Sequence, residues 1–100
     1  MDHAALVFES VREVIIETLK RLTGFLSHQA IFDALKSQGA VAFGQIGLDS
    51  AARREFRAEI EAKLGVTIAE LQVGADETID ALARDVASRL SPAMIRALLR

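Results

Sequence analysis

Residues 49–65 read DSAARREFRAEIEAKLG and contain the signals of one complete amphipathic helix. Asp49 is a favoured N-cap residue, because its side chain can accept a hydrogen bond from a free backbone N–H of the first turn. Gly65 favours the left-handed conformation at which many helices end. Between them one apolar stripe recurs every four residues: Ala52, Phe56, Ile60 and Leu64. We therefore predict a helix that begins after Asp49 and packs one face against other helices.

The preceding part of the chain contains a longer amphipathic helix, expected from about residue 4 to residue 22. Mostly apolar residues recur at three- and four-residue spacing and so fall on one side of this helix: Val7, Val11, Val14, Ile15, Thr18, Leu19 and Leu22. Gly24 is a stop signal just beyond it. A second, short helix is expected over residues 27–39, with Ser27 as its cap and Gly39 at its end.

Two segments lack a clear helical pattern. Residues 39–48 are expected to be irregular, and three apolar side chains in them are available to fill the core: Phe43, Ile46 and Leu48. Residues 66–75 are mixed in character, so we expect one short turn of helix at most.

Two further helices are predicted near the C-terminus. Asp76 is predicted to cap the last main helix, whose apolar face extends to Leu90: Ile79, Leu82, Ala83, Val86, Ala87 and Leu90. Acidic residues in the first turn of this helix suit the positive end of its dipole. Ser91 and Pro92 have the pattern of a cap and first helical residue, which predicts a short tail helix ending at Arg100.

The pattern as a whole predicts an all-α fold, a small bundle of three main helices plus short helices. Each long helix is apolar on one face only, so the helices must pack together. A length of 100 residues is sufficient for one modest core, so we expect a single domain over residues 1–100.

Composition excludes several classes of function. Twelve basic and 14 acidic residues are interspersed and give a net charge of −2, and there is no Trp or Tyr on which bases could stack, so nucleic acid is not an expected partner. The lack of cysteine excludes disulfides and thiolate metal sites. No apolar run reaches the roughly 20 residues of a membrane helix, and Met1 to His3 lack the basic start of a secretory signal. We therefore expect a cytoplasmic protein that does not associate with membranes.

The most informative stretch is FGQIGLDS, residues 43–50. Its last four residues, Gly47 to Ser50, resemble the attachment motif of phosphopantetheine carrier proteins, and Phe43 stands where polyketide and fatty-acid carriers commonly have an aromatic residue. Further segments are similar to the same family: Glu55-Phe56-Arg57, Leu64 to Ile68, Thr78 to Ala83 and Arg89-Leu90. These matches span about half the chain, which therefore resembles an acyl carrier protein of the polyketide-synthase type.

The resemblance implies that Ser50 carries a covalent 4′-phosphopantetheine arm, with Gly47, Leu48 and Asp49 completing the attachment site. An acyl or aminoacyl group would be held as a thioester at the end of that arm. The carrier itself would be non-catalytic, and it would be a monomer. Its partners would be a phosphopantetheinyl transferase and the enzymes that load, condense or tailor the cargo.

The position of Ser50 supports such a site on physical grounds. A serine that follows an N-cap lies where free backbone N–H groups and the positive end of the helix dipole point outward. A phosphodiester on its hydroxyl is stabilised by both. The competing explanation is that Ser50 is only a helix-start serine, which is a common use of this residue.

Four residues near Ser50 are candidate contacts to the phosphate or to partners. Ala51 stands where the family usually has Leu or Met, Arg54 stands where it usually has Val, Ile or Leu, and Arg53 adds a further charge. Arg54 lies one helical turn after Ser50 and Arg57 two turns after it, so both guanidinium groups can reach a phosphate on Ser50 or a carboxylate on the cargo. The alternative is a solvated basic patch, above all for Arg57.

Other functions have less support in the sequence. His3 and His28 are the only histidines and lie in different segments, so we expect neither a metal site nor a histidine base for Ser50. The second hypothesis is an unmodified helical protein–protein interaction or docking module with a carrier-like fold. A small enzyme is the third.

Overall fold

Helices account for most of the residues that the computed structural model describes, which are 3–23, 41–46 and 48–99. The α-helices are α1 (His3–Thr23), α3 (Ser50–Leu64), α4 (Ile79–Arg89) and α5 (Pro92–Leu98), and the 3₁₀ helices are η2 (Phe43–Ile46) and η3 (Glu70–Val73). These ranges contain no strand, only an isolated bridge between Ala42 and Thr78. The predicted all-α fold is therefore confirmed. The predicted short helix over 27–39 and the stop at Gly24 lie outside the described residues.

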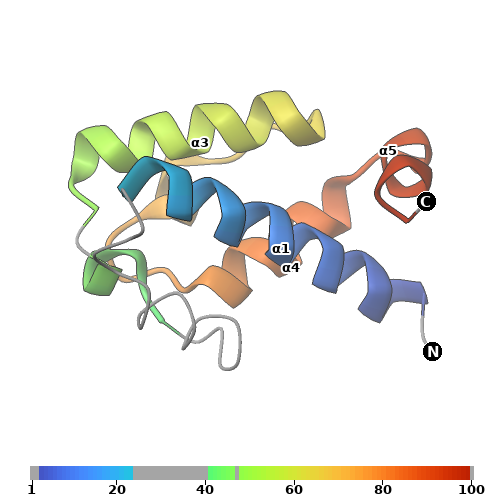
Figure 1. The fold of residues 1–100 in the computed structure, drawn as a ribbon, viewed down its shortest axis with the longest axis horizontal. Helices are drawn as coiled ribbons and strands as arrows, with labels where there is room; N and C mark the ends of the chain where they lie inside the picture. The colour runs from blue at the N-terminus through green and yellow to red at the C-terminus, as the bar shows by residue number, and fades with distance from the viewer. Residues whose placement is uncertain (1–2, 24–40, 47, 100) are drawn as a thin grey trace.

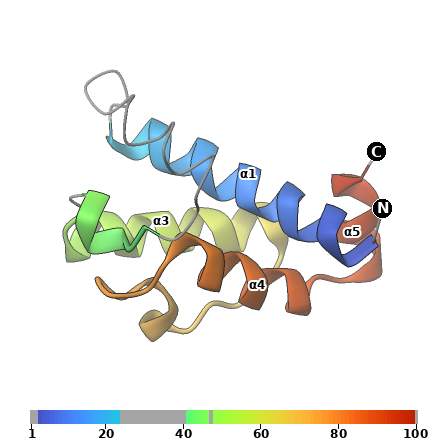
Figure 2. The same cartoon turned by 90° about the horizontal axis from the view of Figure 1, so that it is seen from below.

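The three long helices lie side by side, with α1 packed against both α3 and α4 (Figure 1). Both later helices run in the opposite direction to α1, as a second view also shows (Figure 2). The short helix α5 packs near the first turns of α1. Ser50, the first residue of α3, lies at the opposite end of the bundle.

Side chains from all three long helices form the core. The predicted burial of Phe56, Ile60 and Leu64 is confirmed, whereas Ala52 and Val14 are only half-buried at its edge. The same core includes buried side chains from α1 and α4: Val7, Val11, Ile15, Ile16, Leu19, Ile79, Leu82, Ala83 and Val86. Each large apolar side chain buried in this way contributes about 1.5–3 kcal/mol.

Both predicted ends of α3 are confirmed. The Oδ1 atom of Asp49 accepts a hydrogen bond of 2.8 Å from the backbone N–H of Ala52, which is the bond expected of an N-cap. Gly65 adopts the left-handed conformation with a φ of 65°, and its N–H donates to the carbonyl of Glu61 at 2.9 Å. Glycine reaches this conformation without the steric cost that a Cβ atom imposes. The helix therefore begins and ends at residues that the sequence specifies locally.

The predicted cap of α4 was wrong. Thr78, not Asp76, accepts the hydrogen bond from the N–H of Ala81, at 3.1 Å, and Asp76 is exposed in the preceding turn. The cause is a tertiary contact, because the N–H of Ile79 donates to the carbonyl of Val41 at 3.2 Å. Pairing with the distant segment keeps Thr78 extended, so that the helix begins only at Ile79.

The tail helix begins as predicted and ends earlier. Ser91 accepts a hydrogen bond from the N–H of Met94 at 3.1 Å, and Pro92 occupies the first turn. The helix ends at Leu98 rather than at Arg100, which lies outside the described residues. None of its residues is fully buried, so α5 covers the end of the bundle rather than contributing to its centre.

The segment before α3 is anchored to the body of the molecule. Backbone N–H groups of Phe43 and Gly44 donate to the carbonyls of Glu77 and Ala75, at 2.9 and 2.8 Å. Its apolar side chains fill the core as predicted: Phe43, Ile46 and Leu48 are all buried. The ring of Phe43 packs on that of Phe56, with centroids 5.4 Å apart. The chain that leads into Ser50 is therefore fixed on the core.

Polar contacts join the helices around this core. Arg12 of α1 pairs with Asp80 of α4 at 3.0 Å, with both side chains mostly buried. On the other side of α1, Arg21 pairs with Glu59 of α3. Lys63 of α3 donates to the hydroxyl of the buried Thr18 at 2.8 Å. These pairs link α1 to both of its neighbours through specific residues.

Candidate functional site

Ser50 is the first residue of α3 and is exposed to solvent. The first N–H groups of a helix have no partner within the helix, and they carry the positive end of its dipole. Asp49 occupies one of these groups, that of Ala52. The hydroxyl of Ser50 therefore lies where an attached anion can approach the remaining N–H groups.

The backbone on both sides of Ser50 is held in place. Before it, the side chain of Leu48 is buried, with 4% exposed. The carbonyl of Leu48 accepts a hydrogen bond of 2.7 Å from Nη1 of Arg53. After it, the N–H of Arg53 donates to the carbonyl of Asp49 at 2.9 Å. The serine is thus presented from a fixed helix terminus rather than from a free loop.

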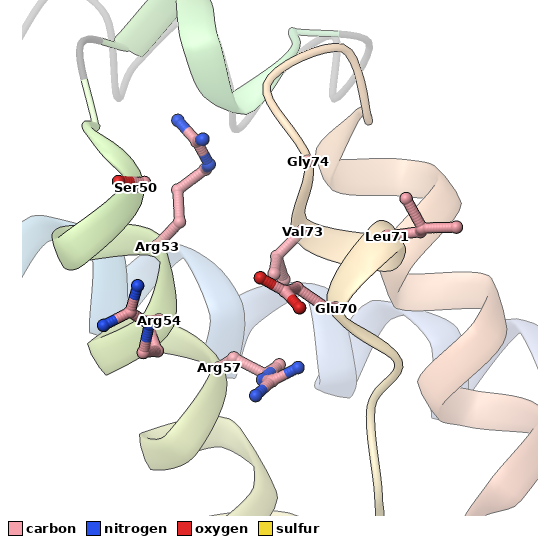
Figure 3. A pocket seen from close by; sticks show the side chains of 8 residues that line it. All are labelled: Ser50, Arg53, Arg54, Arg57, Glu70, Leu71, Val73 and Gly74. Carbon is pink, nitrogen blue, oxygen red and sulfur yellow. The ribbon is translucent and has the colours of Figure 1, made fainter.

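A surface pocket of about 280 Å³ extends from Ser50 along the groove between α3 and η3 (Figure 3). We call it the Ser50 hollow. From α3 it is lined by Ser50, Arg53, Arg54 and Arg57. From η3 and the residue that follows it is lined by Glu70, Leu71, Val73 and Gly74. In Figure 3 the side chain of Arg57 extends towards η3, whereas that of Leu71 projects from the far side of η3.

The structure brings together most of the residues that the sequence singled out. Arg53, Arg54 and Arg57 all line the hollow with Ser50, as their helical spacing predicts. Asp49 is the cap and is exposed. Ala51 is exposed but does not line the hollow.

The other two members of the predicted attachment motif are Leu48 and Gly47. Leu48 is buried in the core, so its side chain anchors the backbone before Ser50 and does not face a ligand. Gly47 lies outside the described residues.

The opposite wall of the hollow was not predicted. Glu70, Leu71, Val73 and Gly74 belong to the segment in which only a short helical turn was expected. That turn is η3, and its packing against α3 depends on the buried Val73 and Ile68. The helical spacing of residues contains no signal of this contact. The contact joins the first two turns of α3 to a segment beyond the end of the helix, and helical periodicity does not extend to that segment.

The three arginines of the hollow differ in their contacts. Arg53 is half-buried and is engaged with the carbonyl of Leu48. Arg54 is exposed, which agrees with the expectation that it is not a core residue. Neither Arg54 nor Arg57 forms an ion pair with any described residue. Two guanidinium groups beside Ser50 are therefore available to an external anion.

No histidine lies beside Ser50 among the described residues, and the acidic side chain that lines the same hollow is that of Glu70. His3 lies at the far end of the bundle, beside Pro92 and Ile95. A serine nucleophile needs an adjacent general base.

Comparisons of the chain with known proteins do not identify a family. Neither family models, curated proteins nor solved structures give a match to the chain. In addition, no helix within the described ranges combines the length and apolar character needed to cross a membrane.

Proposed function

We propose that the chain is a carrier protein that holds an acyl or aminoacyl group as a thioester on a 4′-phosphopantetheine arm attached to Ser50. The observation that carries the proposal is the exposed serine at the first position of α3, held by the Asp49 cap on one side and the buried Leu48 on the other. Residues 43–68 resemble polyketide-type carriers, and this resemblance implies that the group attached to the serine is 4′-phosphopantetheine.

The attachment reaction is carried out by a partner. A phosphopantetheinyl transferase transfers the arm from coenzyme A, so that a bond forms between Oγ of Ser50 and phosphorus. The bond from that phosphorus to the adenosine 3′,5′-bisphosphate portion breaks, and a base of the transferase takes the hydroxyl proton. This chain contributes an accessible hydroxyl and a positive environment for the product, through the α3 N-terminus and Arg54.

Partner enzymes would also carry out the reactions of the cargo, while this chain only holds it. The thiol at the end of the arm forms the thioester, and loading, condensing or tailoring enzymes act on it. The carrier performs no catalysis and would serve polyketide or fatty-acid biosynthesis as a cytoplasmic monomer. The Ser50 hollow begins at the attachment point and offers the first part of the arm a surface to lie on.

The second candidate is an unmodified docking module with the same bundle. It is favoured by Leu71, which is 83% exposed, and by Arg54 and Arg57, which form no ion pair with any described residue. Both features suit a surface that meets a protein whether or not Ser50 is modified.

Mass spectrometry separates the two candidates. The full chain is incubated with coenzyme A, Mg²⁺ and a promiscuous phosphopantetheinyl transferase. A carrier gains the mass of one phosphopantetheine group, and peptide mapping assigns it to Ser50. Ser50→Ala abolishes the gain, whereas Ser88→Ala, which alters another exposed serine, retains it. An unchanged wild-type mass, under conditions that modify a known carrier, contradicts the carrier proposal.

A further inference from the structure

The arginines around the Ser50 hollow form no ion pair with any described residue. Most other cations of the described residues are neutralised by neighbouring carboxylates: Arg12, Lys20, Arg21, Lys63 and Arg89 each take part in an ion pair. Three arginines and one glutamate line the hollow, which gives it a net charge of +2, whereas the whole chain has a net charge of −2. The residues that line the hollow therefore carry a net charge of the opposite sign to that of the whole protein.

The η3 turn that lines the hollow also carries an exposed apolar side chain, which projects from the side of η3 that faces away from α3. Leu71 is 83% exposed, far more than Leu6, the other large apolar side chain that is exposed among the described residues. Its neighbour Val73 is buried and fixes η3 on the core, so Leu71 projects from an anchored turn. Covering an exposed leucine with an apolar surface is favourable, in proportion to the area removed from water.

We propose that Arg54, Arg57 and Leu71 form a docking surface for a protein partner whose own surface is acidic and has an apolar recess. Charge complementarity selects the partner, because each of the two guanidinium groups can donate hydrogen bonds to a carboxylate, and the recess would receive Leu71. The proposal rests on the proposed function in one respect, namely that a partner docked here would lie beside the group carried on Ser50.

Nucleic acid is a poorer fit to this surface than an acidic protein. The positive patch is confined to one side of α3 and is interrupted by Glu70. Phe43 and Phe56 are fully buried and Phe8 is half-buried at the other end of the bundle, so none of the described aromatic rings offers bases a stacking surface beside the patch.

The test uses a defined probe and the full unmodified chain. The probe is a synthetic amphipathic helical peptide with glutamates along one face and leucines along the other, and it is titrated into the ¹⁵N-labelled chain. We expect amide shifts centred on Arg54, Arg57 and Leu71, and weaker binding as salt rises. The matching peptide with lysines in place of glutamates should not bind there.

Substitutions then assign the contacts. We expect Arg54→Glu and Arg57→Glu each to raise the Kd for the acidic peptide by about five- to tenfold, because attraction becomes repulsion. Leu71→Ser should raise the Kd for this peptide but leave weak binding of polyglutamate unchanged. The matched control is Arg96→Glu, which reverses an exposed charge on α5 and should leave the Kd at its wild-type value. A dispersed ¹H–¹⁵N spectrum establishes that each variant is folded.

The outcome is independent of the modification of Ser50. The titration is repeated with Ser50→Ala, which should bind the acidic peptide like the wild type. Peptide binding without modification of the wild-type chain would remove the carrier proposal and leave the docking surface standing. Shifts spread evenly over the molecule, or a Kd that Arg54→Glu and Arg96→Glu change equally, would overturn the docking surface.

Discussion

Nη1 of Arg53 donates a hydrogen bond of 2.7 Å to the carbonyl of Leu48, so a side chain in the first turn of α3 holds the backbone that leads into Ser50. This contact closes a short loop around the candidate attachment site. On one side Leu48 is fixed in the core, and on the other Asp49 caps the helix. Of the three arginines at the hollow, Arg53 therefore holds the backbone of the site, whereas Arg54 is exposed to solvent and Arg57 extends towards η3.

Replacing Arg53 with Ala should loosen this loop. The carbonyl of Leu48 loses a charged donor in a partly buried position, which is expected to lower the free energy of unfolding by about 1–2 kcal/mol. Amide hydrogen exchange at residues 48–50 should accelerate by a larger factor than exchange in the middle of α4. Arg54→Ala is the matched control, because no described group accepts a bond from Arg54. Equal exchange rates in the two variants would show that the bond does not hold the loop.

Replacing Phe56 with Ala should destabilise the whole bundle. Phe56 is fully buried and packs on Phe43, so the change leaves a cavity at the junction of α3 and the segment before it. We expect a loss of about 3–5 kcal/mol, a large part of the stability of a small domain. Urea unfolding followed by circular dichroism measures it. The exposed neighbour Glu55 provides the control, since Glu55→Ala should change stability by less than about 0.5 kcal/mol. A loss below about 1 kcal/mol for Phe56→Ala would contradict its central position.

The two candidate caps of α4 should respond differently to truncation. Thr78→Ala removes the oxygen that accepts from Ala81, and caps of this kind are worth about 0.5–2 kcal/mol. Asp76→Ala removes a carboxylate that is exposed in the preceding turn and should have almost no effect. Thermal unfolding of both variants distinguishes them. The reverse order of stability would restore the assignment of the cap to Asp76.

These helix ends show which parts of the fold can be predicted from sequence. The caps at Asp49 and Ser91 and the stop at Gly65 depend on side chains within four residues, so local chemistry was sufficient to predict them. The start of α4 depends on backbone pairing between Val41 and Ile79, which are far apart along the chain. No local pattern includes that contact.

The candidate site divides in the same way. Helical spacing alone predicted that Arg54 and Arg57 share a flank with Ser50, and both line its hollow. The wall formed by η3 could not be predicted, because it depends on how a loop packs on α3. The modification of Ser50 stays a prediction, since it depends on recognition by another protein and not on the geometry of this chain alone.

Arg54 should affect recognition more than folding. Its side chain is exposed and has no ion-pair partner among the described residues, so Arg54→Ala should leave the melting temperature nearly unchanged. Its guanidinium lies one turn from Ser50 at the same hollow, where it can approach the phosphate of coenzyme A or an acidic partner. We expect Arg54→Ala to slow phosphopantetheine transfer to Ser50 by about two- to fivefold, the scale of one exposed charge contact. Timed mass spectrometry measures this rate.

Ionic strength separates a charge effect from a change of shape at this position. Arg54→Glu should slow transfer more than Arg54→Ala, and the difference between the two variants should shrink as salt is raised, because exposed charges are screened over about 10 Å at 0.1 M salt. Arg96→Glu, at the opposite end of the bundle, is the control and should be modified at the wild-type rate. Wild-type transfer rates for both Arg54 variants at all salt concentrations would make Arg54 a solvated surface residue. A fall of several degrees in the melting temperature of Arg54→Ala would instead assign it a structural role, because a side chain that makes no described contact should not contribute to stability.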